Sequence, residues 1–312
     1  MISLRYHIVS IAAVFLALAV GVVLGSTTIS SRLLSGLSDD NTSLGKQVSD
    51  LQADRNSLNA RLADADRFAT SIGPSVVKGQ LDQRTVVFVT TPDAKPGDRD
   101  ALAALVKSAG ATVTGELQLT DAFTDPAKSD QLRDLVARLL PKGTQLPTAS
   151  DPGTLAGGML GSLLLLNKDT NQPQASPDET AAALSGLASG GFVKQGPNLK
   201  PAQLALVLTG GALSGDSSAD RAATIARFAA QLDRAGAGTV LAGGSGSASG
   251  TGPVGVVRAD TAATQVLSTV DNADGAAGRV VTILALREQL EGKAGRYGNA
   301  GNAQAPAPGM SG

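Results

Sequence analysis

The chain has 312 residues and a net charge of −1 at pH 7, which is enough length for one or two domains and gives no basic stripe for binding nucleic acid. Apolar residues make up 42% of the chain but aromatic residues only 3%, so the core must be built mainly from Ala, Val, Leu and Ile. Cysteine is absent and His7 is the single histidine, which excludes a disulfide framework, a zinc finger, a catalytic cysteine and a Ser-His-Asp triad.

The first predicted element is an apolar segment over residues 8–29, preceded by a short N-terminal flank of residues 1–7. No charged residue occurs from Ile8 to Leu24, and Arg32 closes the segment. A membrane span needs about 20 apolar residues, whereas the apolar core of a signal peptide has about 7–15. The length therefore predicts a retained transmembrane signal-anchor, with cleavage near Gly25-Ser26 as the alternative.

Small residues recur every fourth position within this segment, which places them on one face of a helix: Ala13, Ala17, Gly21 and Gly25. Small residues at this spacing allow two membrane helices to approach closely. The pattern predicts a helix-pairing face. The alternative is that Ala and Gly are merely abundant, since the chain has 37 glycines.

The charges around the segment favour a cytoplasmic N-terminus, with the bulk of the chain extracytoplasmic. Arg5 and the amino group precede the span, whereas Arg32 and Lys46 follow it and are offset by acidic residues at 39 and 40. A single apolar helix favours the inner membrane. An outer-membrane barrel would need aromatic girdles, which two tyrosines and six phenylalanines cannot supply.

A sevenfold repeat of apolar residues follows in residues 33–72. The heptad d positions are Leu37, Leu44, Leu51 and Leu58, extended by Ala65, and the a positions are Asn41, Val48, Arg55, Leu62 and Ala69. This pattern predicts a coiled-coil stalk of roughly 60 Å that forms a parallel homodimer. The alternative is one amphipathic helix packed on its own domain. Gly73-Pro74 is expected to end the helix.

Strand and helix patterns alternate over residues 75–291 and predict a layered α/β domain with a mostly parallel sheet. Strands are expected within residues 84–92, 111–119, 204–211, 239–244 and 255–260, and helices within 98–111, 129–141, 154–166, 176–191 and 218–237. Residues 280–290 give a mixed pattern. Residues 292–312 are rich in Gly, Ala and Pro, which predicts a disordered tail.

The expected strand ends offer possible ligand sites, because open α/β sheets bind ligands beyond the carboxyl ends of their strands. These ends are Thr90-Thr91-Pro92, Thr209-Gly210-Gly211 and Gly243-Gly244-Ser245, where a phosphate or carboxylate could bind. The alternative is that they are ordinary turns. Residues 250–255 match G-x-G-x-x-G, but Pro253 interrupts the motif and a strand rather than a helix is expected after it, so we exclude a dinucleotide site.

Three acidic residues, Asp93, Asp98 and Asp100, lie close together in the sequence. Their oxygens could bind Mg²⁺ or Ca²⁺. The simpler interpretation is that Asp93 caps a turn and Asp98 opens a helix. We therefore expect no metal site, no catalytic residue and no cofactor, and hence no enzyme.

The N-terminal stretch MISLRYHIVSIAAVFLALAVGVVLGS resembles that of the actinobacterial copper transport protein family (MctB, SteB-like). Further similar stretches are TPDA (91–94), VLTGGALS (207–214), ARFAAQL (226–232), STVDN (268–272) and VTILALREQLEG (281–292). The resemblance implies a pore-forming or other cell-envelope component for copper efflux and resistance that keeps intracellular copper low, at the outer membrane in the mycobacterial member. The alternative that it implies is a coiled-coil scaffold at the division septum, which binds a SteA-like partner and regulates peptidoglycan hydrolases.

The residue types argue against a copper channel in the literal sense. Copper sites use Cys and Met for Cu(I) or His for Cu(II). The chain offers His7 at the membrane edge, Met159 on an apolar helix, and methionines at positions 1 and 310. We therefore expect self-association and contact with membrane lipid, together with an indirect effect on copper.

Overall fold

The computed structural model describes residues 4–309, and for residues 26–40 it describes the backbone alone. The chain divides into two units, Met1–Asp64 and Ala65–Gly312. Helix α1 (Leu4–Val77) begins in the first unit and ends in the second. Its stretch Leu4–Gly25 is 22 residues long and is apolar enough to cross a membrane, in agreement with the predicted N-terminal apolar helix.

Helix α1 does not end at Gly73-Pro74, as the sequence predicts, but continues to Val77. Proline removes one hydrogen bond, the one to the carbonyl of Thr70. Pro74 and Thr70 are both exposed, so water can satisfy that carbonyl. The last turn is held by burial instead, because Val77 is 0% exposed.

In the described part of the chain, seven strands of the second unit form one sheet in the order β3-β2-β1-β4-β5-β6-β7. The strands are β1 (Thr85–Thr90), β2 (Thr112–Leu119), β3 (Val193–Gln195), β4 (Leu204–Thr209), β5 (Thr239–Gly243), β6 (Ser268–Val270) and β7 (Arg296–Tyr297). All neighbouring strands pair in parallel except β3, which runs antiparallel to β2. The predicted α/β class with a mostly parallel sheet is confirmed.

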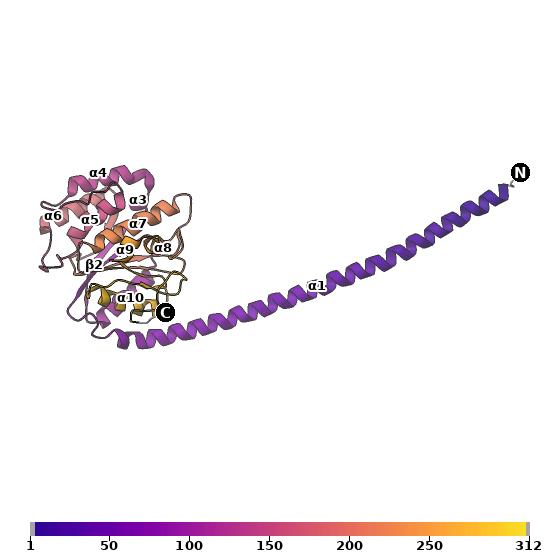
Figure 1. Ribbon diagram of the computed structural model, residues 1–312, viewed down its shortest axis with the longest axis horizontal. Helices are drawn as coiled ribbons and strands as arrows, with labels where there is room; N and C mark the ends of the chain where they lie inside the picture. The colour runs from indigo at the N-terminus through magenta and orange to yellow at the C-terminus, as the bar shows by residue number, and fades with distance from the viewer. Residues whose placement is uncertain (1–3, 310–312) are drawn as a thin grey trace. The chain divides into compact units, whose positions relative to one another are not determined.

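Helices cover both faces of this sheet (Figure 1). They are α2 (Pro96–Ser108), α3 (Asp121–Thr124), the 3-10 helix η1 (Pro126–Lys128), α4 (Ser129–Leu139), α5 (Pro152–Leu164), α6 (Pro177–Ser189), α7 (Ser218–Asp233), α8 (Pro253–Ala259), α9 (Thr261–Thr264) and α10 (Ala276–Gln289). Alternate residues of each strand enter different cores. Val87 and Val89 of β1 pack with α4–α8, whereas Val86 and Phe88 pack with α2, α10 and the end of α1.

The helix starts follow local sequence signals. Ser176 and Glu179 form a capping box at the start of α6, where Ser176 Oγ accepts from the N–H of Glu179 and the carboxylate accepts from the N–H of Ser176. At the start of α5, Asp151 Oδ1 accepts from the N–H of Thr154 at 2.8 Å. Both helices carry proline in their first turn, where its missing N–H has no helical partner to lose.

Two segments differ from the sequence-based expectation. Residues 255–260 are mostly helix α8 rather than a strand, and residues 280–290 lie almost entirely within helix α10. Valine-rich runs this short fit a buried helix as well as a strand. Helix α8 packs directly on the preceding loop at Gly255, where a Cβ would lie 1.9 Å from the carbonyl oxygen of Ser249.

The segment after Gly292 is folded as far as residue 309, so the prediction of disorder does not hold there. Arg296–Tyr297 forms β7 on the edge of the sheet, and Tyr297 is 2% exposed. The N–H of Gln304 donates to the carbonyl of Arg296 at 2.8 Å. Gly/Ala/Pro-rich composition predicts disorder because it buries little apolar surface. Here the buried side chain of Tyr297 and hydrogen bonds such as that of Gln304 hold the segment against the sheet.

Candidate functional site

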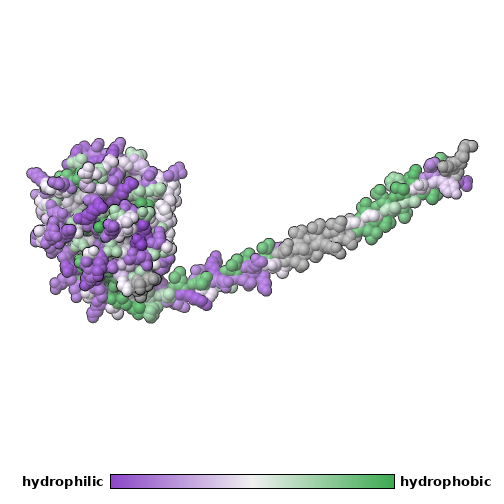
Figure 2. All heavy atoms as spheres, in the orientation of Figure 1, coloured by the Kyte–Doolittle hydropathy of each residue, from purple (hydrophilic) through white to green (hydrophobic). Residues whose placement is uncertain are grey.

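The predicted interface rows of the stalk lie exposed on α1 in the single chain. Leu44, Val48, Leu51, Leu58 and Leu62 are 53–69% exposed, and Asn41 and Arg55 are exposed as well. Figure 2 shows hydrophobic side chains along the described stretches of this helix, whereas the visible face of the globular unit is mainly polar. Leu37, also predicted here, lies outside the described side chains. Large apolar side chains in a regular exposed row indicate an interaction surface.

The small-residue face predicted in the apolar segment is open in the single chain. Ala13, Ala17 and Gly21 are exposed and Gly25 is half-exposed. A Cβ added at Gly21 or Gly25 would meet no other atom within 4 Å. The face is therefore free for close helix contact, and its pairing role remains a prediction.

The end of α1 is bound to the globular unit through the N-terminus of α10. Asp66 Oδ1 accepts from the N–H of Ala276, the first residue of α10, at 2.5 Å. A carboxylate at this position also interacts favourably with the helix dipole. Gly73 lies against Val280, and a Cβ there would come within 2.9 Å of that side chain. Residues 65–77 therefore belong to the globular unit.

The first strand end predicted as a ligand loop is closed by the chain's own carboxylate. Asp93 Oδ2 accepts from the N–H of Gly210, at the end of β4, at 3.0 Å. Asp93 Oδ1 accepts from the Thr91 hydroxyl, at the end of β1, at 2.5 Å. The two strand ends flank the point where the order of strands reverses, which is where open α/β sheets bind anions. The carboxylate of Asp93 takes the place that an anionic ligand would occupy.

The next strand end is closed in the same way. Asp274 Oδ2 accepts from the N–H of Ser245, just after β5, at 3.1 Å. Arg279, in the first turn of α10, donates to the carbonyl of Asp274 at 3.0 Å and pairs with Asp98 at 3.1 Å. Burial raises the pKa of Asp98, and the neighbouring guanidinium of Arg279 opposes that shift. This edge is thus a connected polar network rather than an open ligand loop.

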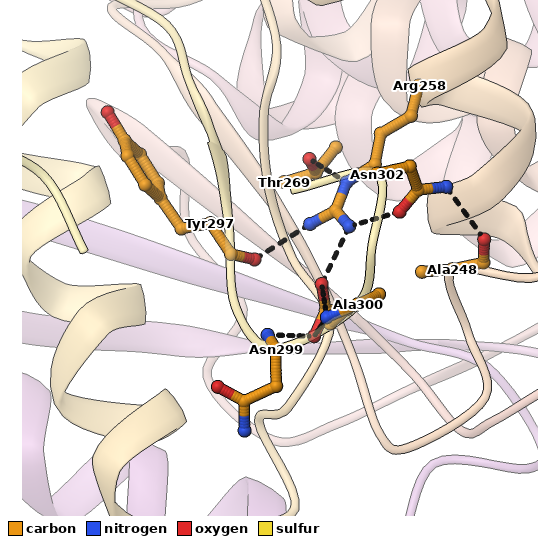
Figure 3. Close-up of polar contacts among 8 residues, drawn as sticks. Ala248, Arg258, Thr269, Tyr297, Asn299, Ala300 and Asn302 are labelled. Carbon is orange, nitrogen blue, oxygen red and sulfur yellow. Dashed lines mark hydrogen bonds and ion pairs between the residues drawn. The ribbon is translucent and has the colours of Figure 1, made fainter. Parts of the chain in front are cut away.

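A buried ion pair joins Arg258 of α8 to Asp271, the residue that follows β6 (Figure 3). The two side chains are 1% and 5% exposed and lie 2.6 Å apart. Arg258 also donates to the carbonyl of Tyr297, at 2.7 Å, and to the side chain of Asn302, at 2.8 Å. Asp271 Oδ1 accepts from the N–H of Asn299 at 2.8 Å. Burial lowers the pKa of Arg258, and the hydrogen bond with Asp271 opposes this shift.

One glycine makes this network possible. Gly298 has φ +132°, a conformation that L side chains rarely adopt. A Cβ there would lie 2.2 Å from Asp271 Oδ1, so any side chain would displace the carboxylate. The network fastens the segment after β7 to the sheet.

Two cavities open near these strand ends. A cavity of about 470 Å³ lies beside the ends of β5 and β6, where Ser245, Asp271, Asn272 and Asn299 contribute to its lining. A smaller cavity of about 190 Å³ lies beside β1, β2 and β3. In the smaller cavity, Glu116 accepts from Arg99 and from the Thr90 hydroxyl, both at 2.7 Å. Arg99 and Glu116 in the smaller cavity and Asp271 in the larger one already have internal partners.

The other sequence candidates do not form a site. Asp93, Asp98 and Asp100 bond to different groups, namely Gly210, Arg279 and Arg99. Asp98 does not open the helix, as the sequence predicts, but lies in the first turn of α2, which begins at Pro96. Among the described residues, no three His, Asp or Glu side chains are grouped to hold a metal ion. Gly252 of the G-x-G-x-x-G match packs against its own loop, because a Cβ there would lie 2.1 Å from the Ser247 carbonyl oxygen.

Sequence reasoning missed the Arg258–Asp271 pair and the Asp66 contact. Both join residues far apart in the chain, and a single charged residue in a sequence does not indicate its partner. It also missed the continuation of the sevenfold rows beyond Ala69, because the helix was expected to end at Gly73-Pro74. The signal was present, since Ile72 and Val76 occupy the next d and a positions.

Comparison with known proteins identifies the family. Residues 1–308 match the family described as copper transport outer membrane protein, MctB. The chain is 41% identical over 273 residues to the copper transporter MctB of Mycobacterium tuberculosis and of Mycobacterium bovis, covering 86% of this chain and 87% of each relative. It is 42% identical over 276 residues to the copper transporter MctB of Mycobacterium leprae, with the same coverage. The resemblance drawn from the sequence is therefore confirmed, and the chain belongs to the MctB family of copper transport membrane proteins.

Proposed function

We propose that this chain is a non-enzymatic membrane protein of the cell envelope that serves copper transport as an anchored dimeric scaffold. Copper transport is what the names of its relatives state. The scaffold mechanism is supported chiefly by the carboxyl edge of the sheet. Asp93, Asp274 and Asp271 occupy the backbone N–H groups that substrates or cofactors use in open α/β enzymes.

The metal chemistry of the described side chains supports an indirect role in copper transport. Cu(I) is bound by Cys and Met, and Cu(II) by imidazole and other nitrogen or oxygen ligands. Met159 is 0% exposed and packs within the core, and His7 lies alone near the start of α1. Copper would therefore be carried by another component of the envelope, which this chain positions.

A copper titration tests the indirect role. The unit Ala65–Gly312 should take no Cu(I) from a chelator of known affinity, and Met159→Leu, which conserves the buried volume, should behave identically. A stoichiometric tight site in the parent chain would show that the chain handles copper itself. Loss of that site in Met159→Leu would identify the ligand.

The globular unit is proposed to lie on the extracytoplasmic side of the inner membrane, as the charges flanking the apolar helix favour. Alkaline phosphatase fused after residue 312 should be active. Green fluorescent protein exported by the same route should be dark. The opposite pair of results would place the globular unit in the cytoplasm.

The septal scaffold is the second candidate, and the exposed row on α1 favours it. This row offers an interface for self-association and, beyond it, a docking place for a SteA-like partner. The two candidates differ in what a cell loses when the row is disrupted. A variant with Leu51→Ala and Leu58→Ala should raise cell copper if the dimer serves copper transport, and should disturb septation if the dimer serves cell-wall hydrolases.

A further inference from the structure

Nearly all large apolar side chains in the described part of the globular unit are shielded from solvent. Among the described residues from 65 to 309, the exposed large apolar side chains are Phe68, Ile72 and Val76, at 64%, 40% and 43%. All three lie on the last turns of α1. A clustered apolar row on an otherwise polar surface indicates a binding surface.

This row and the globular contact lie on different faces of the helix. The residues turned toward the globular unit are Asp66, Gly73 and Val77, spaced seven and four residues apart. Phe68, Ile72 and Val76 are spaced by four and form a neighbouring stripe. At about 100° per residue, the two stripes are separated by roughly a quarter turn. A second helix can therefore reach the apolar stripe while α1 stays bound to its own globular unit.

The sevenfold repeat along the chain indicates which partner covers this apolar stripe. The d row of Leu44, Leu51 and Leu58 reaches Ile72 after two further heptads, and the a row of Val48 and Leu62 reaches Val76. Phe68 falls at g, the position that flanks the seam of a parallel two-stranded coil. An unrelated partner would have no reason to keep the register of the stalk, whereas a second copy of this chain must keep it.

We propose that a second copy of this chain covers Phe68, Ile72 and Val76, so that the coiled coil continues alongside the globular units instead of ending before them. The proposal rests on the dimeric scaffold proposed above and extends it. Because Asp66 and Gly73 fix the same helix to the globular unit, the two units of a dimer are held rigidly at the coil's end. A flexible tether at Gly73-Pro74 would leave them independent.

Disulfide trapping in the full-length chain in its own membrane tests this proposal, because the chain contains no cysteine to interfere. Single variants Leu51→Cys, Ile72→Cys and Ser71→Cys are oxidised under identical conditions. Ser71 adjoins Ile72 but falls at c, away from the seam, and serves as the matched control. Leu51→Cys and Ile72→Cys should each give roughly tenfold more covalent dimer than Ser71→Cys, since a disulfide needs Cβ atoms within about 4.5 Å. Val76→Cys provides an independent test at an a position.

The outcomes separate this proposal from the one on which it rests. If Leu51→Cys is trapped but Ile72→Cys and Val76→Cys give no more dimer than Ser71→Cys, the stalk dimer stands. The row beside the globular unit then binds something else, a lipid surface or a different protein, and the continuation is wrong. If none of the variants is trapped above the control, the dimeric scaffold itself fails.

Discussion

Disrupting the predicted seam with Leu51→Ala and Leu58→Ala should convert a dimer into a monomer. In the single chain the two leucines are 68% and 63% exposed, so truncating them removes little from the isolated helix. In a packed seam, each Leu→Ala change costs about 2–5 kcal/mol. A dimer contains four changed side chains, and at the lower figure their loss weakens association by about 8 kcal/mol. At about 1.4 kcal/mol per tenfold, this corresponds to between roughly five and six orders of magnitude in Kd.

The assay uses a soluble form with residues 30–312, which keeps the folded segment after Gly292. Analytical ultracentrifugation at micromolar concentration should show a dimer for the parent and a monomer for the double variant. Asp50→Ala with Ser57→Ala, at c positions one residue before each leucine, is the matched control and should remain dimeric. Circular dichroism should show that the globular unit is intact in each case, because that unit begins at Ala65. A monomeric parent, or a double variant with unchanged Kd, would refute the seam.

Two further predictions concern buried charges in the globular unit. Burial raises the pKa of Asp233 to about 7, whereas the unfolded chain ionises near 3.8. The unfolded state therefore loses its proton first, and stability falls as pH rises from about 4 to about 7. Asp233→Asn, which keeps an acceptor for the N–H of Thr239, should abolish this fall and stabilise the unit at pH 8 by about 4 kcal/mol at ~1.4 per pKa unit, as urea denaturation at pH 5 and 8 would show. Arg258→Met should lower the free energy of unfolding of the globular unit by about 3–5 kcal/mol, because it leaves the Asp271 carboxylate buried without its partner, and should expose the chain near Arg296 to trypsin. The double variant Arg258→Met with Asp271→Asn should recover part of this loss. Equal stability of the parent and the single variant would contradict the prediction.

The regular parts of the fold were predictable because their signals are local. The strands at residues 85–90 and 204–209 are unbroken apolar runs, and each is buried on both sides by helices. The capping box at Ser176 and Glu179 can likewise be read from four consecutive residues. Such elements depend little on the rest of the chain.

The two short strands β6 and β7 at one end of the sheet could not be predicted, because tertiary contacts define them. Strands β6 and β7 have three and two residues, too short for a periodic pattern. Their position depends on Arg258, which donates to Asp271, 13 residues further along the chain, and to the carbonyl of Tyr297, 39 residues further along. The composition of the tail predicts disorder because composition does not reveal where its backbone hydrogen bonds are satisfied.

The end of helix α1 differs from the sequence-based expectation for a related reason. Proline normally terminates a helix, so the sevenfold count stopped at Ala69. Near a helix end, however, proline costs one hydrogen bond that water replaces, and burial of Val77 outweighs the loss. Extending the count by one heptad would have reached Ile72 and Val76 from sequence alone.

Asp66 lies between the predicted seam of α1 and the carboxyl edge of the sheet. It follows Ala65, a d position of the predicted seam, and its carboxylate accepts from the N–H of Ala276 at the start of α10. The first turn of α10 carries Arg279, which contacts Asp98 and the carbonyl of Asp274, and Asp274 closes the loop after β5. These contacts connect the end of α1 with the carboxyl edge of the sheet. At that edge the N–H groups of Gly210, Ser245 and Asn299 donate to the chain's own carboxylates, those of Asp93, Asp274 and Asp271.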